Sequence, residues 1–245
     1  MSGHSKWNNI KRKKEKTDGA RAKVFTKIGR ELSVAVKEGG GPDPNANSRL
    51  KDCIAKAKAA NVPNENIERI IKKAAGEGND NKYENITYEG YGPNGIAVIV
   101  ETLTDNRNRT AGDLRHYFDK FGGNLGTNGC VSFLFQRRGV LVIEREGLGE
   151  DKVMEDCLEA GASDFQADDD VFEIYTEPDD FSGVLSDLER KGYRFVTAEI
   201  EMVPNSYVSL TDEGAASRMQ HLLDALEDND DVQNIWHNWE NPEEE

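Results

Sequence analysis

The spacing of the apolar residues changes near residue 80, and this change constrains the fold more than any other feature. Between residues 24 and 76 apolar residues recur at three- and four-residue steps, the period of an amphipathic helix. The glycine run 39–41 and Pro63 divide this stretch into three short helices, each marginal alone, which predicts a helical bundle over 24–76. The expected stripes consist of Val24, Phe25, Ile28, Leu32, Ala35 and Val36, then Leu50, Ile54, Ala57 and Val62, then Ile67, Ile70, Ile71 and Ala74.

The ends of these helices also carry local signals. The second helix is expected to begin near Ser48, Asn64 to be the N-cap of the third, and Gly76 to end it. Residues 77–82 are polar and resemble a linker. Residues 1–23 contain too few apolar side chains to bury a core, so we expect a flexible basic arm there.

Beyond residue 82 the pattern is that of strands joined by polar turns. Segments 86–91 and 96–103 flank the turn sequence Gly-Pro-Asn-Gly at 92–95 and predict a β-hairpin. A polar loop over 104–109 leads to Thr110, which with the acidic residue at 113 resembles a capping box. The helix that follows should end at the glycine pair 122–123, before a strand over 131–135.

The pattern of apolar residues over 138–203 predicts strands and helices in the order β-α-β-β-α-β, which is typical of a ferredoxin-like domain. A helix over 215–226 and a strand over 232–239 then complete the first α/β unit, so 138–203 reads as an insertion. The predicted fold class is α+β multidomain, with a helical bundle and two α/β domains, the third inserted in the second. The expected parts are a basic arm at 1–23, the bundle at 24–76, an α/β domain at 82–137 plus 204–240, and the insertion at 138–203.

Composition agrees with several small domains. Leu, Ile, Val and Phe make up 53 of 245 residues, which favours thin separate cores over one large core. No apolar run is long enough to span a membrane. Three widely spaced cysteines without a C-x-x-C pair argue against a disulfide framework and a cysteine zinc site, so a reducing cytoplasm is expected.

Charge is divided unevenly. Residues 1–75 hold 18 basic and 8 acidic residues, whereas residues 146–245 hold 5 basic and 29 acidic residues. Clustered lysines and arginines bind phosphate backbones because they release condensed counterions. A solvated tail without a specific partner is the alternative, and the density of charge favours a polyanion. The candidate nucleic-acid-binding residues here are Lys6, Trp7 (as a base-stacking ring), Lys11, Arg12, Lys13, Lys14, Lys16, Arg21, Lys23, Lys27 and Arg30.

Two polar segments of the central region are further candidates. The loop 105–110 joins a strand to a helix N-terminus, where arginines and backbone N–H groups can bind phosphate. Its arginines could equally pair with Asp105 or Asp113. The glycine-rich segment 122–129 follows a helix and precedes a strand, the wrong order for a dinucleotide loop, and could be a simple connection. The candidate residues are Asn106, Arg107, Asn108, Arg109, Asn124, Thr127 and Asn128.

Signals of catalysis are missing from the sequence. The four histidines have no metal-ligand spacing, and the carboxylates form no recognisable catalytic pair. We therefore predict a protein without catalytic residues, metal, cofactor or small-molecule substrate, and without a membrane partner.

Five motifs resemble those of the YebC/PmpR family, which includes the mitochondrial translational activator of cytochrome c oxidase. The motifs are Ser2–Asn8, Phe25–Ile28, Tyr88–Pro93, Asp105–Thr110 and Gly122–Gly126. The resemblance implies three domains with the third inserted in the second. It also implies a role in gene expression, since the family is labelled as probable transcriptional regulators while some members act in translation or on ribosomes stalled at proline-rich sequences. The family pattern starts at residue 2, which leaves no room for an organelle presequence and implies a bacterial cytoplasmic member.

We thus expect a non-enzymatic nucleic-acid-binding regulator of gene expression. Its partner is expected to be ribosomal RNA within the ribosome, or promoter DNA, with basic ribosomal proteins as additional partners. The alternative is a protein-interaction module that uses the acidic C-terminal part. Because no helix-turn-helix is recognisable, the residues favour irregular RNA, whereas the family label favours DNA.

Overall fold

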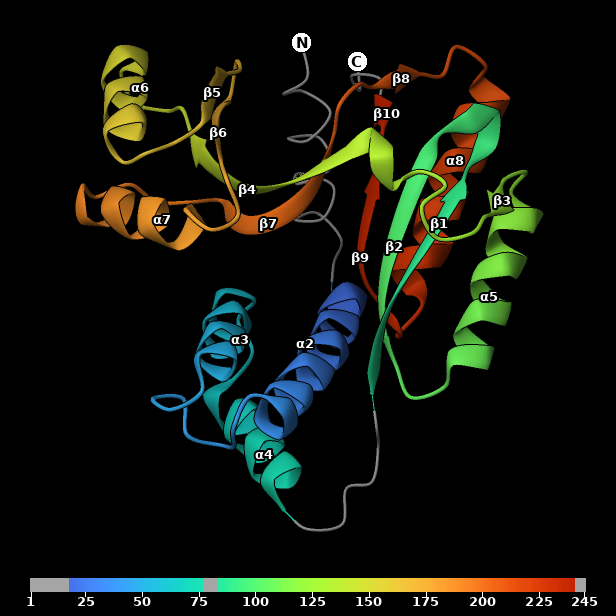
Figure 1. Cartoon of the computed structure of the whole chain (residues 1–245), viewed down its shortest axis with the longest axis horizontal. Coiled ribbons are helices and arrows are strands. Elements are labelled where there is room, and N and C mark those ends of the chain that lie inside the picture. Colours follow the sequence, from blue (N-terminus) through green and yellow to red (C-terminus); the bar gives the residue numbers. More distant parts are fainter. Residues whose placement is uncertain (1–17, 77–82, 241–245) are drawn as a thin grey trace. The chain divides into compact units, whose positions relative to one another are not determined.

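The computed structural model describes residues 18–76 and 83–240 and has a mixed α+β fold (Figure 1). Contacts divide the described chain into two compact units. The first unit comprises residues 18–128 and 214–235, and the second comprises residues 129–213 and 236–240. In the described parts, no helix has the length and apolar character needed to cross a membrane. The finer domain boundaries expected from the sequence remain predictions.

Three helices of the first unit share one apolar core. They are α2 (Asp18–Glu38), α3 (Ser48–Ala59) and α4 (Asn64–Ala75). Their buried cluster follows the predicted stripes, with Leu32, Leu50 and other members excluded from solvent. Burial of these stripes stabilises helices that are too short to be stable alone.

Three details of these helices differ from the sequence prediction. Helix α2 begins at Asp18, so the predicted flexible arm is helical from that residue on. Val24 is 40% exposed and lies outside the core. Asn64 is the first helical residue of α4 and does not cap it. Gly76 ends α4 as predicted, in an extended conformation that any residue could adopt.

The sheet of the first unit has the strand order β3-β1-β2-β9. The predicted hairpin is confirmed: β1 (Glu84–Tyr91) pairs antiparallel with β2 (Ala97–Thr104) across a short 3₁₀ turn. The outer strands are β3 (Asn124–Leu125) and β9 (Val232–His237).

Helices α5 (Arg107–Lys120) and α8 (Glu213–Asp228) lie beside this sheet (Figure 1). Gly90 lets α5 and β3 approach β1, because a Cβ there would lie 2.9 Å from Cε1 of Phe118 and 2.6 Å from the carbonyl oxygen of Asn124.

The second unit confirms the ferredoxin-like order. Its sheet has the strand order β5-β6-β4-β7, and every neighbouring pair is antiparallel. Its helices bury one face of the sheet in a core around Phe172 and Leu188. In sequence it falls between β3 and β9 of the other sheet, as the predicted insertion requires. The elements are β4 (Phe135–Glu144), α6 (Glu150–Glu159), β5 (Asp164–Ala167), β6 (Val171–Thr176), α7 (Phe181–Arg190) and β7 (Thr197–Pro204).

Two predicted strands are wrong in part. Residues 132–134 of the expected strand 131–135 form a 3₁₀ turn (Ser132–Leu134), and the strand starts only at Phe135. The expected final strand is broken after His237. Trp239 and Glu240 form β10, which pairs in parallel with β8 (Val208–Ser209). The backbone N–H of Trp239 donates to Nδ1 of His237 (3.2 Å), so this bend satisfies a group that a continuous strand would pair elsewhere.

Two glycines of the second unit give opposite predictions. In Gly139→Ala the new Cβ would lie only 2.5 Å from Cδ2 of Phe181 and would also overlap the hydroxyl of Thr176, so we expect a loss of about 1–3 kcal/mol. Gly183 lies within α7 with open space around it, so Gly183→Ala should stabilise by about 0.5–1 kcal/mol. Urea unfolding followed by circular dichroism measures both. Equal midpoints for the two variants would contradict this packing.

Candidate nucleic-acid interface

The predicted basic residues fall into three groups. Lys6, Trp7, Lys11, Arg12, Lys13, Lys14 and Lys16 lie outside the described residues. Arg21 lies on α2. Lys23, Lys27 and Arg30 also lie on α2, and the structure describes the contacts of their side chains.

These three cations of α2 are held by the last turn of α8 and by the segment that joins α8 to β9. Lys23 Nζ lies 2.6 Å from Oδ1 of Asp228, and Lys27 Nζ donates to the carbonyl oxygen of Glu227 (2.9 Å). Arg30 Nη1 donates to Oδ1 of Asp231 (2.6 Å) and to the carbonyl of the preceding residue (2.8 Å). A phosphate would have to displace these partners. The Lys23 pair is exposed and therefore weak, whereas the Arg30 pair is largely buried.

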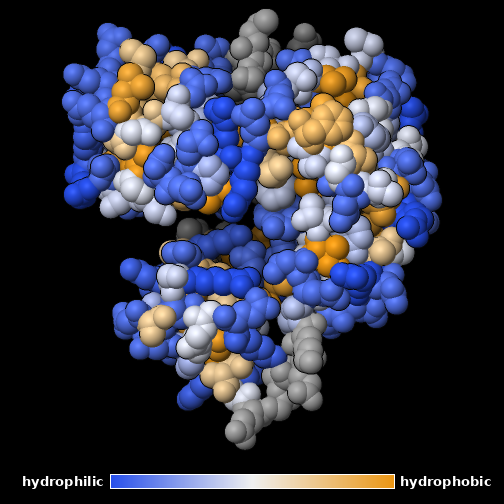
Figure 2. All heavy atoms as spheres, in the orientation of Figure 1, coloured by the Kyte–Doolittle hydropathy of each residue, from blue (hydrophilic) through white to orange (hydrophobic). Residues whose placement is uncertain are grey.

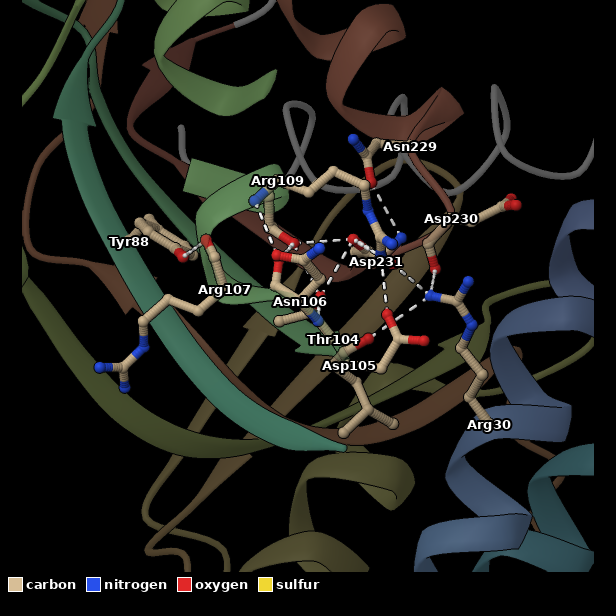
Figure 3. A network of polar contacts seen from close by, with 12 residues as sticks. Arg30, Tyr88, Thr104, Asp105, Asn106, Arg107, Arg109, Asn229, Asp230 and Asp231 are labelled. Carbon is tan, nitrogen blue, oxygen red and sulfur yellow. Dashed lines mark hydrogen bonds and ion pairs between the residues drawn. The ribbon is translucent and has the colours of Figure 1, made fainter. Parts of the chain in front are cut away.

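Asp231 is the centre of this network (Figure 3). Its side chain is only 4% exposed. Besides Arg30, Arg109 Nη2 donates to both of its oxygens (3.1 and 2.8 Å), and Thr110 Oγ1 donates to Oδ2 (2.7 Å). Burial alone would raise the pKa of Asp231, but the hydrogen bonds from Arg109, Thr110 and Arg30 outweigh burial and lower it. Asp231 thus connects α2, α5 and the start of β9 through one ionised carboxylate.

The predicted loop 104–109 is shorter than expected, and Thr110 is not a cap. Helix α5 begins at Arg107, and Oδ1 of Asn106 caps it by accepting from the backbone N–H of Arg109 (3.1 Å). Thr110 is instead buried inside the helix. The capping box pattern misled because the acceptor for the Thr110 hydroxyl, Asp231, is 121 residues away.

The two arginines of this first turn have different surroundings. Arg109 also donates to Asp105 (2.9 Å), so the alternative expectation of pairing with that acid holds here. Among the described residues, Arg107 pairs only with Glu84 (3.1 Å), and both side chains are about half exposed or more. Such a pair contributes little stability, which leaves Arg107 available to an incoming phosphate. Asn106 and Asn108 are exposed beside it.

The glycine-rich segment 122–129 packs closely at its start and is exposed at its end. A Cβ at Gly123 would lie 2.5 Å from the carbonyl oxygen of Tyr91, so this glycine permits close contact with β1. Asn124 belongs to β3, yet it is exposed, as are Thr127 and Asn128. The segment 122–129 therefore connects α5 to the following chain and also exposes polar side chains at its C-terminal end.

Four lysines of α3 and α4 form a group that belongs to none of the motifs recognised in the sequence. Lys51, Lys58, Lys72 and Lys73 are exposed and make no hydrogen bond or ion pair with any described residue. By contrast, Arg49 pairs with an acid of α2. Lys51 and Lys58 are seven residues apart and share a helix face. This seven-residue spacing is the sequence signal from which the shared face could have been predicted. Figure 2 shows a mostly hydrophilic surface over these helices.

An open hollow of about 570 Å³ lies next to the Asp231 network. Its acids outnumber its cations, and those cations already have carboxylate partners. The hollow therefore repels phosphate as it stands. Among the described side chains, no group of three or more His, Cys, Asp or Glu is placed to hold a metal ion. The lining consists of Lys23, Arg30, Asp105, Arg109, Asp113, Asp228, Asn229, Asp230 and Asp231.

The fold places this chain in a class of α+β proteins with a basic helical part and two α/β parts, one of which is inserted in the sequence of the other. The TACO1/YebC N-terminal domain model matches residues 5–77, and the model of the TACO1/YebC second and third domain matches residues 83–239. The chain belongs to the TACO1/YebC family.

Relatives match over nearly the whole chain. A protein of Acetivibrio thermocellus named "Probable transcriptional regulatory protein" is 61% identical over 98% of this chain and 99% of its own length. A protein of Finegoldia magna with the same name is 57% identical, covering 98% of this chain and all of the relative. The crystal structure of a conserved hypothetical protein from Aquifex aeolicus is 46% identical, with a TM-score of 0.82 and 94% of each chain covered. These findings confirm the predicted fold class and family, and the names point to a regulatory protein.

Proposed function

We propose that the protein is a nucleic-acid-binding regulator of gene expression that contacts the phosphate backbone through its basic N-terminal third. The observation that carries this proposal is the excess of 18 basic over 8 acidic residues in 1–75, together with exposed α3 and α4 lysines that have no described counter-ion. Uncompensated cations on a rigid helical surface gain most from a polyanion, because binding releases condensed counterions. The proposed place of action is the cytoplasm, and the proposed role requires no catalysis.

The first turn of α5 supplies the proposed second contact. Arg107 and the exposed side chains of Asn106 and Asn108 present donors beside the positive end of the helix dipole. Arg109 keeps this turn in place through Asp105 and Asp231. The exposed Asn124, Thr127 and Asn128 are a further proposed contact.

Ribosomal RNA is the target that the residues favour. The exposed face of α4 alternates acids such as Glu65 and Glu68 with lysines, which does not suit a helix that reads the major groove. Irregular RNA can be bound through phosphate contacts and loops. The second candidate is a DNA-binding transcriptional regulator, which the names of the relatives favour. Docking of the acidic part, residues 146–245, on basic ribosomal proteins would add to either role.

Salt-dependent binding of the full chain to a structured ribosomal RNA fragment and to a mixed-sequence DNA duplex tests this proposal. The logarithm of the affinity should fall linearly with the logarithm of salt concentration, and RNA should bind more tightly. Tighter binding to the duplex would favour the transcriptional role. Failure to bind either nucleic acid at low salt would overturn the proposal.

The α3 lysines give a sharper version of the same test. Lys51→Gln with Lys58→Gln should weaken binding roughly tenfold at about 0.1 M salt and reduce the salt slope by about 1.5. A matched control, Arg190→Gln with Arg194→Gln, removes the same charge from the acidic second unit and should change binding little. Equal losses in the two variants would show that net charge, and not this helix face, determines affinity.

A further inference from the structure

Phe133 is the most exposed large apolar side chain among the described residues, with 68% of its surface accessible. Exposing most of a phenyl ring to water sacrifices burial energy that a large aromatic residue normally contributes to a core. Its neighbours Val131 and Phe135 are buried at 0% and 6% exposure. The apolar residues two positions before and two positions after Phe133 are therefore buried, whereas the Phe133 ring is exposed to solvent.

The backbone that carries this ring is fixed on both sides. Phe133 is the middle residue of the 3₁₀ turn Ser132–Leu134, in which the N–H of Leu134 donates to the carbonyl of Val131 (2.9 Å). Asn205 fastens the turn from another segment: its backbone N–H donates to the carbonyl of Leu134 (2.8 Å), and its side-chain amide donates to that of Phe133 (3.3 Å). The backbone of this turn therefore loses little further conformational entropy when a ligand contacts the ring.

The charge around this turn is also unusual for the second unit. Residues 129–213 hold 7 basic and 21 acidic residues, yet the whole segment 121–143 contains no acid. Arg137 and Arg138 follow Phe133 within five residues, and Arg137 is exposed. Arg138 donates to the side-chain oxygen of Gln136 (2.8 Å). Neither arginine has a carboxylate partner among the described residues. In the sheet Arg138 lies opposite Glu201 of β7, whereas Arg137 lies opposite Met202, so Arg137 is the cation that an anionic ligand could approach.

We infer that Phe133 is a stacking platform for an unpaired nucleobase, with Arg137 contacting the adjoining phosphate. An exposed aromatic ring on a fixed backbone, with arginines close by in the sequence, suits the stacking of single-stranded bases, because every base has a π face. This inference rests on the proposed function and narrows it to a single-stranded segment of RNA. It also assigns a nucleic-acid contact to the second unit, which is otherwise acidic.

Affinity measurements with a short unstructured RNA test the inference. Phe133→Leu keeps an apolar side chain but removes the ring, and should weaken binding roughly tenfold, whereas Phe133→Tyr should bind as the wild type does. Leu158→Ala is the matched control, since Leu158 is 57% exposed in the same unit and should not affect binding. Binding to a DNA duplex should be equal in all four proteins. Because the ring is exposed, unfolding midpoints of all variants should also stay close to that of the wild type.

Photo-crosslinking provides a readout that a structural role would not produce. The same RNA carrying 5-iodouridine should crosslink within the peptide that contains Phe133, and this crosslink should be lost in Phe133→Leu. Normal RNA affinity in Phe133→Leu, together with no crosslink at this turn in the wild type, would overturn the inference while leaving the proposed function intact, and would point to a protein contact instead. Absence of binding by the wild type to every nucleic acid would overturn both.

Discussion

Replacing Asp231 by alanine is expected to lower the free energy of unfolding by about 2–4 kcal/mol. The substitution removes a carboxylate that is 4% exposed and accepts hydrogen bonds from Arg30, Arg109 and Thr110. The two guanidinium groups then lose their shared counter-ion and repel each other. The loss stays below the full cost of breaking a buried pair, because Arg109 is 45% exposed and reaches water. Urea unfolding at neutral pH measures this change.

Two comparisons distinguish this network from general surface charge. Asp228→Ala removes a carboxylate that is 69% exposed and should cost less than about 1 kcal/mol. The effect of Asp231→Ala should also depend on pH. Because the pKa of Asp231 is lowered in the folded state, its stabilisation is complete above the ordinary carboxyl pKa near ~4 and disappears as pH falls through the folded-state value. The variant and the wild type should therefore converge in strong acid. A constant difference down to low pH would contradict an ionised Asp231.

Neutralising Lys11, Arg12, Lys13 and Lys14 with glutamine is expected to produce the largest loss of nucleic-acid binding. Each lost phosphate contact lowers the salt slope by about 0.7–0.9, so four lost contacts should lower it by about 3 and reduce affinity at ~0.1 M salt by more than about 100-fold. The measurement is a titration of fluorescently labelled RNA at several salt concentrations.

A charge-preserving control makes this result specific. Exchanging the same four positions between lysine and arginine keeps every positive charge and should leave the salt slope unchanged. If the neutralised variant binds RNA as tightly as the wild type, the basic segment is only a solvated tail. Retained binding to basic protein partners, with RNA binding lost, would separate the nucleic-acid role from the protein-interaction alternative.

Local patterns in the sequence predicted most of the fold. The turn sequence at 92–95 predicted the hairpin of β1 and β2. The succession of helix-like and strand-like segments over 138–203 predicted the β-α-β-β-α-β order of the inserted domain. Failures occurred where a local pattern competed with a distant partner. Residues 131–135 are mostly apolar and were predicted to form a strand, yet Asn205 holds their centre in a turn. Asn238 likewise leaves the last strand because its carbonyl accepts from the N–H of Val208 (2.7 Å).

The candidate interface was less predictable than the fold, since charge in a sequence does not reveal its counter-ion. The sequence predicted Lys23 and Arg30 to contact phosphate, but both form ion pairs with acids about 200 residues away. Lys51 and Lys58 belong to no motif, and their lack of a described partner is visible only with the helices in place. Phe133 was predicted to lie in a strand, and its exposure depends on a turn that no short motif encodes.

Co-sedimentation of the native protein with ribosomal subunits from gently lysed cells tests the central claim most directly. We expect the protein to migrate with one subunit, and nuclease treatment or neutralisation of Lys11–Lys14 to release it. Intact protein that remains at the top of the gradient would contradict binding to ribosomal RNA and would favour DNA-binding transcriptional control.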